Sequence, residues 1–207
     1  MRPIDLQNIA ASTIGHYDAH AESYWHGTRE HDVSQNISAL LGAIEGEPPF
    51  KILDLGCGPG RDLISFKRLG HHAIGLDGSE KFVVMARSHS GCEVWQQDLH
   101  SLALPSAMFD GVFANAVLFH VATIALPDVL AAIWQCLKPR GVLFSSNPRG
   151  QDQAGFNGAR YGAYHTLATW RRYLEAANFS EVTHYYRPSD APPEQQHWLA
   201  SVWRKVG

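Results

Sequence analysis

Long apolar runs are missing from this sequence of 207 residues, and no stretch is long enough to predict a membrane-spanning helix. No positively charged leader followed by an apolar segment opens the chain, so a secretory signal is not expected. Cysteine is scarce: only Cys57, Cys92 and Cys136 occur, and their wide separation fits no zinc-ligand spacing. We therefore expect unpaired thiols, no metal site, no membrane partner and a soluble cytoplasmic protein.

An excess of positive charge is also lacking. Lysine and arginine together number 17 against 20 acidic residues, and the formal net charge is -3. Such a balance does not favour nucleic acid or an anionic membrane as a partner. Hydrophobic residues make up 45% of the chain, and its length suits one domain with a sizeable core. We predict a single domain over residues 1–207, with a helical cap over 1–46 and a core over 50–207; the oligomeric state stays open.

The stretch 51–63, KILDLGCGPGRDL, carries the strongest local signal. Its apolar start predicts a buried strand, and the closely spaced glycines at 56, 58 and 60 predict a sharp turn after it. Glycine permits positive φ and lets a ligand approach the backbone without a Cβ in the way. The helix that follows presents unpaired N–H groups at the same place. Together these features predict a cradle for a small polar ligand at the carboxyl end of a strand.

Two ligand classes fit such a cradle, and an ordinary strand-to-helix turn is a third interpretation. A dinucleotide fingerprint has the form G-x-G-x-x-G, but Arg61 occupies its third glycine position. The spacing here is G-x-G-x-G, preceded by Asp54, and LDLGCGPG resembles the first motif of the class I S-adenosylmethionine-dependent methyltransferases. The resemblance implies a methyltransferase whose cofactor is S-adenosyl-L-methionine.

The remainder of the sequence alternates short apolar segments with amphipathic ones, which predicts a mostly parallel sheet with helices on both faces. The last two predicted strands are joined by a loop around Pro192 and Pro193 that contains no helix, so the seventh strand should be antiparallel. The predicted fold is α/β: a three-layer, Rossmann-like, seven-stranded, mostly parallel sheet with an antiparallel last strand and extra N-terminal helices. The strands after the first are predicted at 72–77, 93–98, 109–117, the end of 137–148, 181–186 and 197–206.

A helix is predicted over residues 4–25, where Ile4, Leu6, Ile9 and Ile14 recur at helical spacing. Within it, residues 17–24, YDAHAESY, resemble the Y-D-x-x-A-x-x-Y opening of many small methyltransferases. The resemblance implies that this helix covers the cofactor. The alternative is a helix that only packs on the edge of the domain.

The resemblance also implies cofactor contacts at the carboxyl ends of the strands, where ligands bind in open α/β sheets. Asp54 would orient the glycine loop or accept from the cofactor's ammonium, Asp77 would hold the ribose, and Asp98 would read the adenine edge. The expected cofactor-binding set is Tyr17, Asp54, Gly56, Cys57, Gly58, Arg61, Asp77, Gly78, Asp98, Leu99, Asn115 and Ala116.

The stretch 147–165, NPRGQDQAGFNGARYGAYH, is predicted to be a long irregular loop that closes over the acceptor as a lid, with a plain surface insertion as the alternative. Arg149 is expected to bind a carboxylate of the acceptor. The candidate acceptor-binding residues are His31, Asn36, Asn147, Arg149, Tyr161, Tyr164, Tyr186 and Arg187. The candidate catalytic residues are His120 and His165, each a possible base, although a lone histidine is more often structural.

Three functions remain open at this stage. The first is methyl transfer to a small polar or heteroaromatic acceptor, because the segments outside the predicted core are short and rich in aromatic residues. The second is methylation of protein or RNA, although RNA would call for a basic face. The third is cofactor binding without catalysis, against which the acids at both strand ends argue. The sequence leaves open whether nitrogen, oxygen, sulfur or carbon is methylated.

Overall fold

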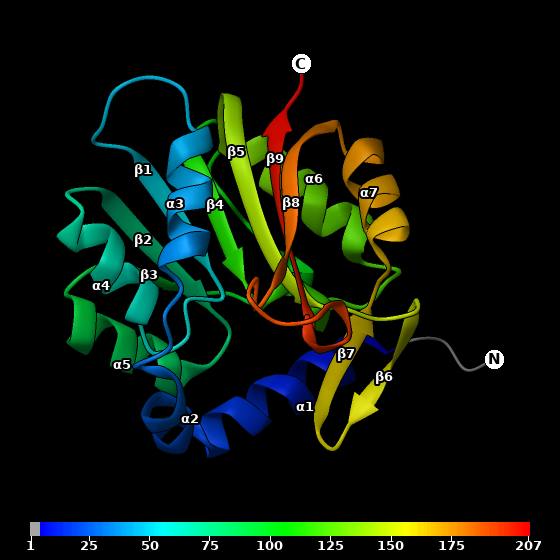
Figure 1. The fold of residues 1–207 in the computed structure, drawn as a ribbon. Helices are drawn as coiled ribbons and strands as arrows, with labels where there is room; N and C mark the ends of the chain where they lie inside the picture. The colour runs from blue at the N-terminus through cyan, green and yellow to red at the C-terminus, as the bar shows by residue number, and fades with distance from the viewer. Residues whose placement is uncertain (1–4) are drawn as a thin grey trace.

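The protein is described by a computed structural model over residues 5–207, so Ile4 and the rest of 1–4 lie outside the described part of the predicted cap. A seven-stranded sheet forms the middle layer, in the order β3-β2-β1-β4-β5-β9-β8 (Figure 1). Its strands are β1 (Lys51–Leu55), β2 (His72–Asp77), β3 (Glu93–Gln96), β4 (Phe109–Asn115), β5 (Leu137–Pro148), β8 (Phe179–Arg187) and β9 (Trp198–Lys205).

The strand directions confirm the predicted topology. The pairs β3–β2, β2–β1, β1–β4 and β4–β5 are parallel, whereas β9 runs antiparallel to both β5 and β8. A short loop joins β8 to β9, and only an antiparallel neighbour can be reached without a crossover helix. The carboxyl ends of the parallel strands therefore meet at one edge of the sheet, which is where ligands bind in open α/β folds.

Helices cover both faces of the sheet and bury its apolar side chains. On one face lie α3 (Ser34–Ala43), α4 (Arg61–Arg68) and α5 (Glu80–Ser90). On the other lie α6 (Leu126–Cys136) and α7 (Leu167–Ala176). Successive residues of β1 point to opposite faces of the sheet. Ile52 packs with Phe66 and Phe113 on the first face, whereas Leu53 packs in the apolar core on the other face. The three-layer prediction is confirmed.

The N-terminal segment forms two helices where the sequence predicted one over 4–25. The first, α1 (Leu6–Ala19), ends at His20, whose φ of -116° and ψ of 17° break the helix before α2 (Ala21–Thr28) begins. In Figure 1, α1 lies across the carboxyl ends of the strands. It packs there against α5 and against the hairpin described next. Within residues 5–207 no helix is both long and apolar enough to cross a membrane.

The prediction of an irregular loop over 147–165 was wrong, because most of this stretch forms a two-stranded antiparallel hairpin. Strands β6 (Gln153–Asn157) and β7 (Arg160–Tyr164) pair in register around a tight turn. Helix α1 holds this hairpin through Ser12 Oγ, which donates to Ala159 O at 2.8 Å, and through Thr13 Oγ1, which accepts from Tyr161 N at 3.1 Å. Both partners come from the opposite end of the chain, so local sequence signals could not reveal the pairing.

Candidate active site

The glycine loop after β1 takes the sharp path that the sequence predicted. Gly56 has φ +69° and Gly60 has φ +96°, conformations that side chains with a Cβ rarely adopt. A Cβ on Gly56 would lie 2.6 Å from Val117 Cβ, and one on Gly60 would lie 2.9 Å from Ala86 Cα. The loop therefore runs close to the segment after β4 and to α5, and its glycines are needed for both approaches.

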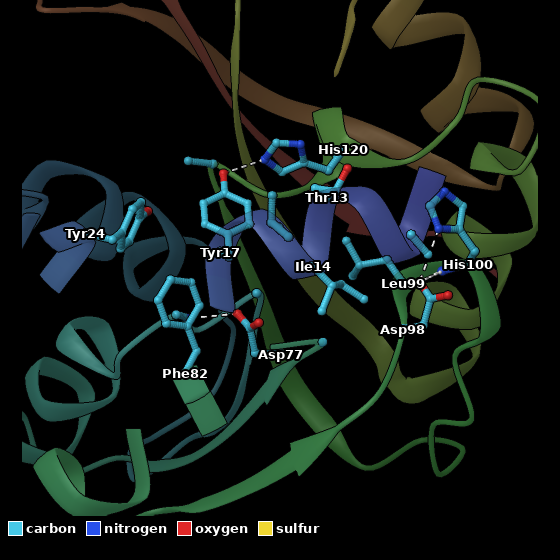
Figure 2. A pocket seen from close by; sticks show the side chains of 16 residues that line it. Thr13, Ile14, Tyr17, Tyr24, Asp77, Phe82, Asp98, Leu99, His100 and His120 are labelled. Atoms are coloured by element: carbon cyan, nitrogen blue, oxygen red, sulfur yellow. Dashed lines mark hydrogen bonds and ion pairs between the residues drawn. The ribbon is translucent and has the colours of Figure 1, made fainter. Parts of the chain in front are cut away.

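A cavity opens beside this loop at the carboxyl ends of β1, β2, β3 and β4, under α1 (Figure 2). Of the predicted cofactor-binding residues, it brings together Tyr17, Gly56, Gly58, Asp77, Gly78, Asp98, Leu99 and Ala116. It is also lined by residues that the sequence did not single out: Ala10, Thr13, Ile14, Tyr24, Phe82, His100 and Val117, besides the candidate base His120.

Asp77 lies at the end of β2 with its carboxylate turned to the cavity (Figure 2). Its Oδ2 accepts from Gly58 N at 2.9 Å and its Oδ1 accepts from Ser79 N at 2.9 Å. Burial raises the pKa of Asp77 to about 6, although these backbone donors oppose the rise. The group is thus an ionised acceptor at neutral pH that still has lone pairs for donors from a ligand.

Asp98 follows β3 and is held by His100. The His100 backbone N–H donates to Asp98 Oδ1 at 3.0 Å, and its ring Nδ1 lies 3.1 Å from the same oxygen. Because His100 Nε2 accepts from Ala122 N at 3.2 Å, the proton of a neutral ring sits on Nδ1 and points at Asp98. Burial alone raises the pKa of Asp98, but the hydrogen bonds from His100 outweigh it and lower the pKa below its ordinary value.

His120 connects α1 with the hairpin at the far side of the same cavity. Its Nδ1 lies 2.6 Å from Tyr161 O and its Nε2 lies 2.8 Å from the Tyr17 hydroxyl. A carbonyl oxygen only accepts, so Nδ1 donates to it, and Nε2 is left to accept from Tyr17. Burial lowers the pKa of His120 to about 4, which keeps the ring neutral. The Tyr17 proton is therefore committed to His120, so the Tyr17 oxygen can only accept from other donors, and the Arg160 side chain is one of them.

A second cavity adjoins the first and shares Tyr17, Tyr24 and Ala116 with it. Four predicted site residues besides these line it: His31, Arg61, Asn115 and Arg187. Its other lining residues are Thr28, Asp32, Val33, Phe119, Ser146, Arg160, Pro188 and Trp198. The two cavities meet at the shared aromatic residues, at the carboxyl end of β4.

Several predicted residues lie in a buried polar network behind the second cavity. Arg61 Nε and Nη2 donate to Asp62 at 2.7 and 2.9 Å, and Asn115 Nδ2 donates to Asp62 Oδ2 at 3.3 Å. Asn36 is fully buried, donates to Asn115 Oδ1 at 3.0 Å and accepts from the Tyr185 hydroxyl at 3.0 Å. The sequence suggested that Asn36 binds the acceptor, but its side chain is enclosed by protein partners and faces neither cavity.

The other predicted acceptor-binding residues, which lie just after β5, on the hairpin and on β8, do not line the second cavity. Arg149 is exposed; its Nη1 donates to Pro193 O and Gln196 O, and its guanidinium lies 4.3 Å from the centre of the Tyr186 ring. The predicted acceptor role of Arg149 and of the Tyr186 ring that it covers therefore has no support from their positions. Tyr161 is buried and serves through its carbonyl, while the Tyr164 ring stacks on Phe119 without lining the second cavity.

His165 and Asn147 line a small closed cavity behind Phe119. Neither ring nitrogen of His165 has a hydrogen-bond partner within residues 5–207, and Nδ1 lies 3.6 Å from Asp152 Oδ1. Burial lowers the pKa of His165, so the ring is uncharged at neutral pH. Since this cavity is separate from the two at the strand ends, His165 is not positioned there as a base.

The chain matches the family model for a methyltransferase domain over residues 52–141, which contain the glycine loop, Asp77, Asp98 and β4. It is 29% identical over 201 residues to a ubiquinone biosynthesis O-methyltransferase of Dinoroseobacter shibae, covering 82% of this chain and 79% of that protein. It is 35% identical over 141 residues to a trans-aconitate 2-methyltransferase of Acidovorax sp., covering 67% of this chain and 53% of that one. Residues 52–141 are therefore a methyltransferase domain, and the chain is similar to class I S-adenosylmethionine-dependent methyltransferases.

Solved structures agree with this family in fold. The 1,6-didemethyltoxoflavin-N1-methyltransferase of Burkholderia thailandensis, solved with 1,6-didemethyltoxoflavin and S-adenosylhomocysteine, superimposes with a TM-score of 0.79. The match covers 100% of this methyltransferase chain and 93% of the other at 23% identity. Among curated relatives, the matched region spans from 34% to 79% of their own length. The acceptors in the names of these relatives are therefore stated of those proteins only.

The residues of the first cavity fit the cofactor of this family, S-adenosylmethionine. Asp77 offers a carboxylate to hydroxyl donors, and Asp98 offers one to an amino group. Asp54 is buried beneath the glycine loop, and its Oδ2 has no hydrogen-bond partner within residues 5–207. Burial, then the nearby Asp62, raise the pKa of Asp54 well above its ordinary value. A cationic donor such as the cofactor's ammonium group would relieve this unpaired oxygen.

Proposed function

We propose that this methyltransferase binds S-adenosylmethionine in the first cavity and methylates a small molecule held in the second. The observation that carries the proposal is that the two cavities share Tyr17, Tyr24 and Ala116, so that ligands in each would meet at one junction. The curated relatives that act on ubiquinone precursors and trans-aconitate, and the toxoflavin enzyme, support a small acceptor by their names.

The cofactor, when bound, supplies a methyl group already activated on a sulfonium, whose C–S electron pair leaves with the sulfur as the acceptor's lone pair takes the methyl. What remains for the chain is alignment, because an in-line displacement is sensitive to small misplacement. Asp77 and Asp98 would fix the nucleoside, and Gly56 and Gly58 would bring backbone against the methionine part. Tyr17 and Tyr24 would then bound the passage between the two ligands.

The hydrogen-bond chain from Tyr161 O through His120 to Tyr17 fixes which groups donate and which accept at the junction. The Tyr17 proton is committed to His120 Nε2, so the Tyr17 oxygen acts as an acceptor toward the cavities. It would accept the O–H or N–H of the acceptor and thereby turn the acceptor's lone pair toward the methyl group, and the proton that the acceptor loses on methylation would leave to solvent. A ring whose pKa is about 4 does not hold a proton at neutral pH, so His120 acts here as a positioning residue.

Methylation of protein or RNA gains no support from these observations. The net charge of -3 offers no attraction for RNA. Cofactor binding without catalysis is the remaining alternative, and the ordered Tyr17–His120 pair at the junction favours catalysis over it. Transfer of a labelled methyl group from S-adenosylmethionine to a panel of phenols, carboxylic acids and heteroaromatic compounds tests the proposal directly. Cofactor binding with no transfer to any small compound, or label found only on protein or RNA, would contradict it.

Tyr17→Phe should lower kcat by roughly 10- to 100-fold while changing the dissociation constant of S-adenosylhomocysteine by less than about threefold, because the ring stays and only the oriented oxygen is lost. Steady-state kinetics on the best acceptor of the panel, beside calorimetry, measure both quantities. Tyr173→Phe, which removes a hydroxyl from α7 at a distance from both cavities, is the matched control. An unchanged kcat in Tyr17→Phe would remove the Tyr17 oxygen from the reaction.

Between pH 5.5 and 8, titration of His120 should not change the kcat of the unsubstituted enzyme. The pKa of His120 is about 4, so its ring is already neutral throughout this range. Activity through this group should be lost only as the pH falls through about 4, where protonated Nε2 can no longer accept from Tyr17. A pH profile of kcat, compared with that of His120→Asn, checks this. A limb near pH 6 to 7 that His120→Asn abolishes would show that His120 acts as a base instead.

A further inference from the structure

Three arginines line the second cavity, and they differ in how fully the chain satisfies them. Arg61 uses three of its five N–H groups within the chain: two donate to Asp62 and a third, at 3.1 Å, donates to Thr28 O. Its charge is neutralised by that carboxylate at 2.7 Å. Arg61 therefore belongs to the wall of the cavity and has little left to offer a ligand.

Arg160 begins β7 and is partly buried beside the junction of the two cavities. No carboxylate of residues 5–207 forms an ion pair with it. The chain offers its guanidinium only the Tyr17 hydroxyl, where its charge opposes the rise that burial causes in the pKa of Tyr17. A partly buried guanidinium without a counter-ion is an arrangement that an anionic ligand completes.

Arg187 ends β8 on the wall of the same cavity. Its Nη2 donates to the backbone carbonyl of Asp32 at 3.0 Å, which leaves the remaining N–H groups of the fork without a partner in residues 5–207. The Asp32 carboxylate also lines the cavity and accepts from Ser34 N at 2.8 Å. The cavity thus holds two incompletely used guanidinium groups and one exposed acid, a balance that suits a singly charged anion better than a doubly charged one.

Aromatic rings form other parts of the wall. The Phe119 and Trp198 rings lie edge to face with their centres 6.5 Å apart, and Tyr24 adds a third ring at the junction. Flat apolar surfaces of this kind bind flat ligands, because stacked or edge-on contact buries both faces of a planar group. Charged side chains and aromatic rings therefore line the same cavity.

We propose that the acceptor is a planar carboxylate, whose carboxylate group is bound by Arg160 and Arg187 while its conjugated body packs against Phe119 and Trp198. This inference rests on the proposed function and names its substrate class.

The test uses pairs of compounds that differ only in charge, bound to the complex of the protein with S-adenosylhomocysteine. The probes are 3,4-dihydroxybenzoate against its amide and 4-hydroxycinnamate against its amide. Calorimetry should show that the acids bind at least about tenfold more tightly than the amides. Arg160→Gln and Arg187→Gln should each remove roughly 10- to 100-fold of the affinity for the acid and leave the affinity for the amide nearly unchanged. Arg172→Gln, on the surface of α7, makes the same charge change away from the cavities.

Equal affinity for acid and amide, failure of every acid to bind, or an unchanged acid affinity in both cavity variants would overturn the proposal. These outcomes are distinct from failure of the proposed function, because they are read from binding without any methyl transfer. If neutral compounds are methylated in a manner that depends on Tyr17 while the acids do not bind, the junction is correct and the substrate class is wrong. If the acids bind as expected and no compound is methylated, the cavity recognises carboxylates and the catalytic proposal fails.

Discussion

Asp77→Asn is expected to weaken the binding of S-adenosylhomocysteine by roughly 10- to 100-fold at pH 8, equivalent to about 1.5–3 kcal/mol for hydrogen bonds to a charged acceptor. The amide has only one accepting oxygen, and its NH2 group must face either the Gly58 N–H or the Ser79 N–H, both of which the carboxylate now satisfies. Isothermal calorimetry measures the loss. Asp190→Asn, in the exposed loop between β8 and β9, removes the same charge away from the cavity and should leave the affinity unchanged.

The same residue predicts how cofactor affinity depends on pH. The pKa of Asp77 is about 6 in the free protein, and a ligand that donates hydroxyl groups prefers the ionised form. Affinity should therefore be level above pH 7 and should fall as the pH drops through about 6, approaching about tenfold per pH unit below it. Asp77→Asn should abolish this dependence. Identical affinities for the two proteins at every pH would remove Asp77 from the cofactor site.

Gly56→Ala is expected to abolish cofactor binding and to lower the free energy of unfolding by roughly 2–4 kcal/mol. The φ of +69° disfavours any Cβ, and the new methyl group would sit only 2.6 Å from Val117 Cβ, so the loop and the segment after β4 cannot both keep their places. Denaturant unfolding and calorimetry with S-adenosylhomocysteine give the two measurements.

Gly42→Ala is the matched control for that variant. Gly42 lies in α3 with no atom within 4 Å of a new Cβ, so alanine there should stabilise the protein by about 0.5–1 kcal/mol through its better helix propensity. If Gly56→Ala instead keeps both stability and cofactor affinity, the close approach to Val117 is not a constraint on the cradle.

Local patterns in the sequence were enough to predict that these residues meet at the first cavity. The glycine loop and Asp98 come just after strands and Asp77 ends one, and parallel strands bring their carboxyl ends to one edge whatever else the chain does. The antiparallel seventh strand was predictable for a similar reason, because a short connection excludes a crossover. These features depend on short-range geometry and on one topological rule.

The acceptor half depends on contacts between distant segments, and the sequence was a poorer guide to it. Arg149 and Arg160 lie in the same glycine-rich stretch, but the pairing of β6 with β7 carries Arg160 to the junction while Arg149 stays at the surface, over Tyr186. The hairpin itself depends on side chains of α1. His100 had no signal of its own, and only the fold brings Ala122 N to its ring and so fixes which nitrogen faces Asp98.

Helix α1 forms part of the wall of both cavities. It contributes Tyr17 to both cavities, and Ser12 and Thr13 tie it to the hairpin that carries Arg160. Any displacement of α1 that opens the way to the first cavity must disturb those ties and the wall of the second. By thermodynamic reciprocity, whatever factor the cofactor gains from a bound acceptor, the acceptor gains from a bound cofactor. Release of the methylated product then loosens the hold on the spent cofactor, so that departure of the two products is coupled through a single helix.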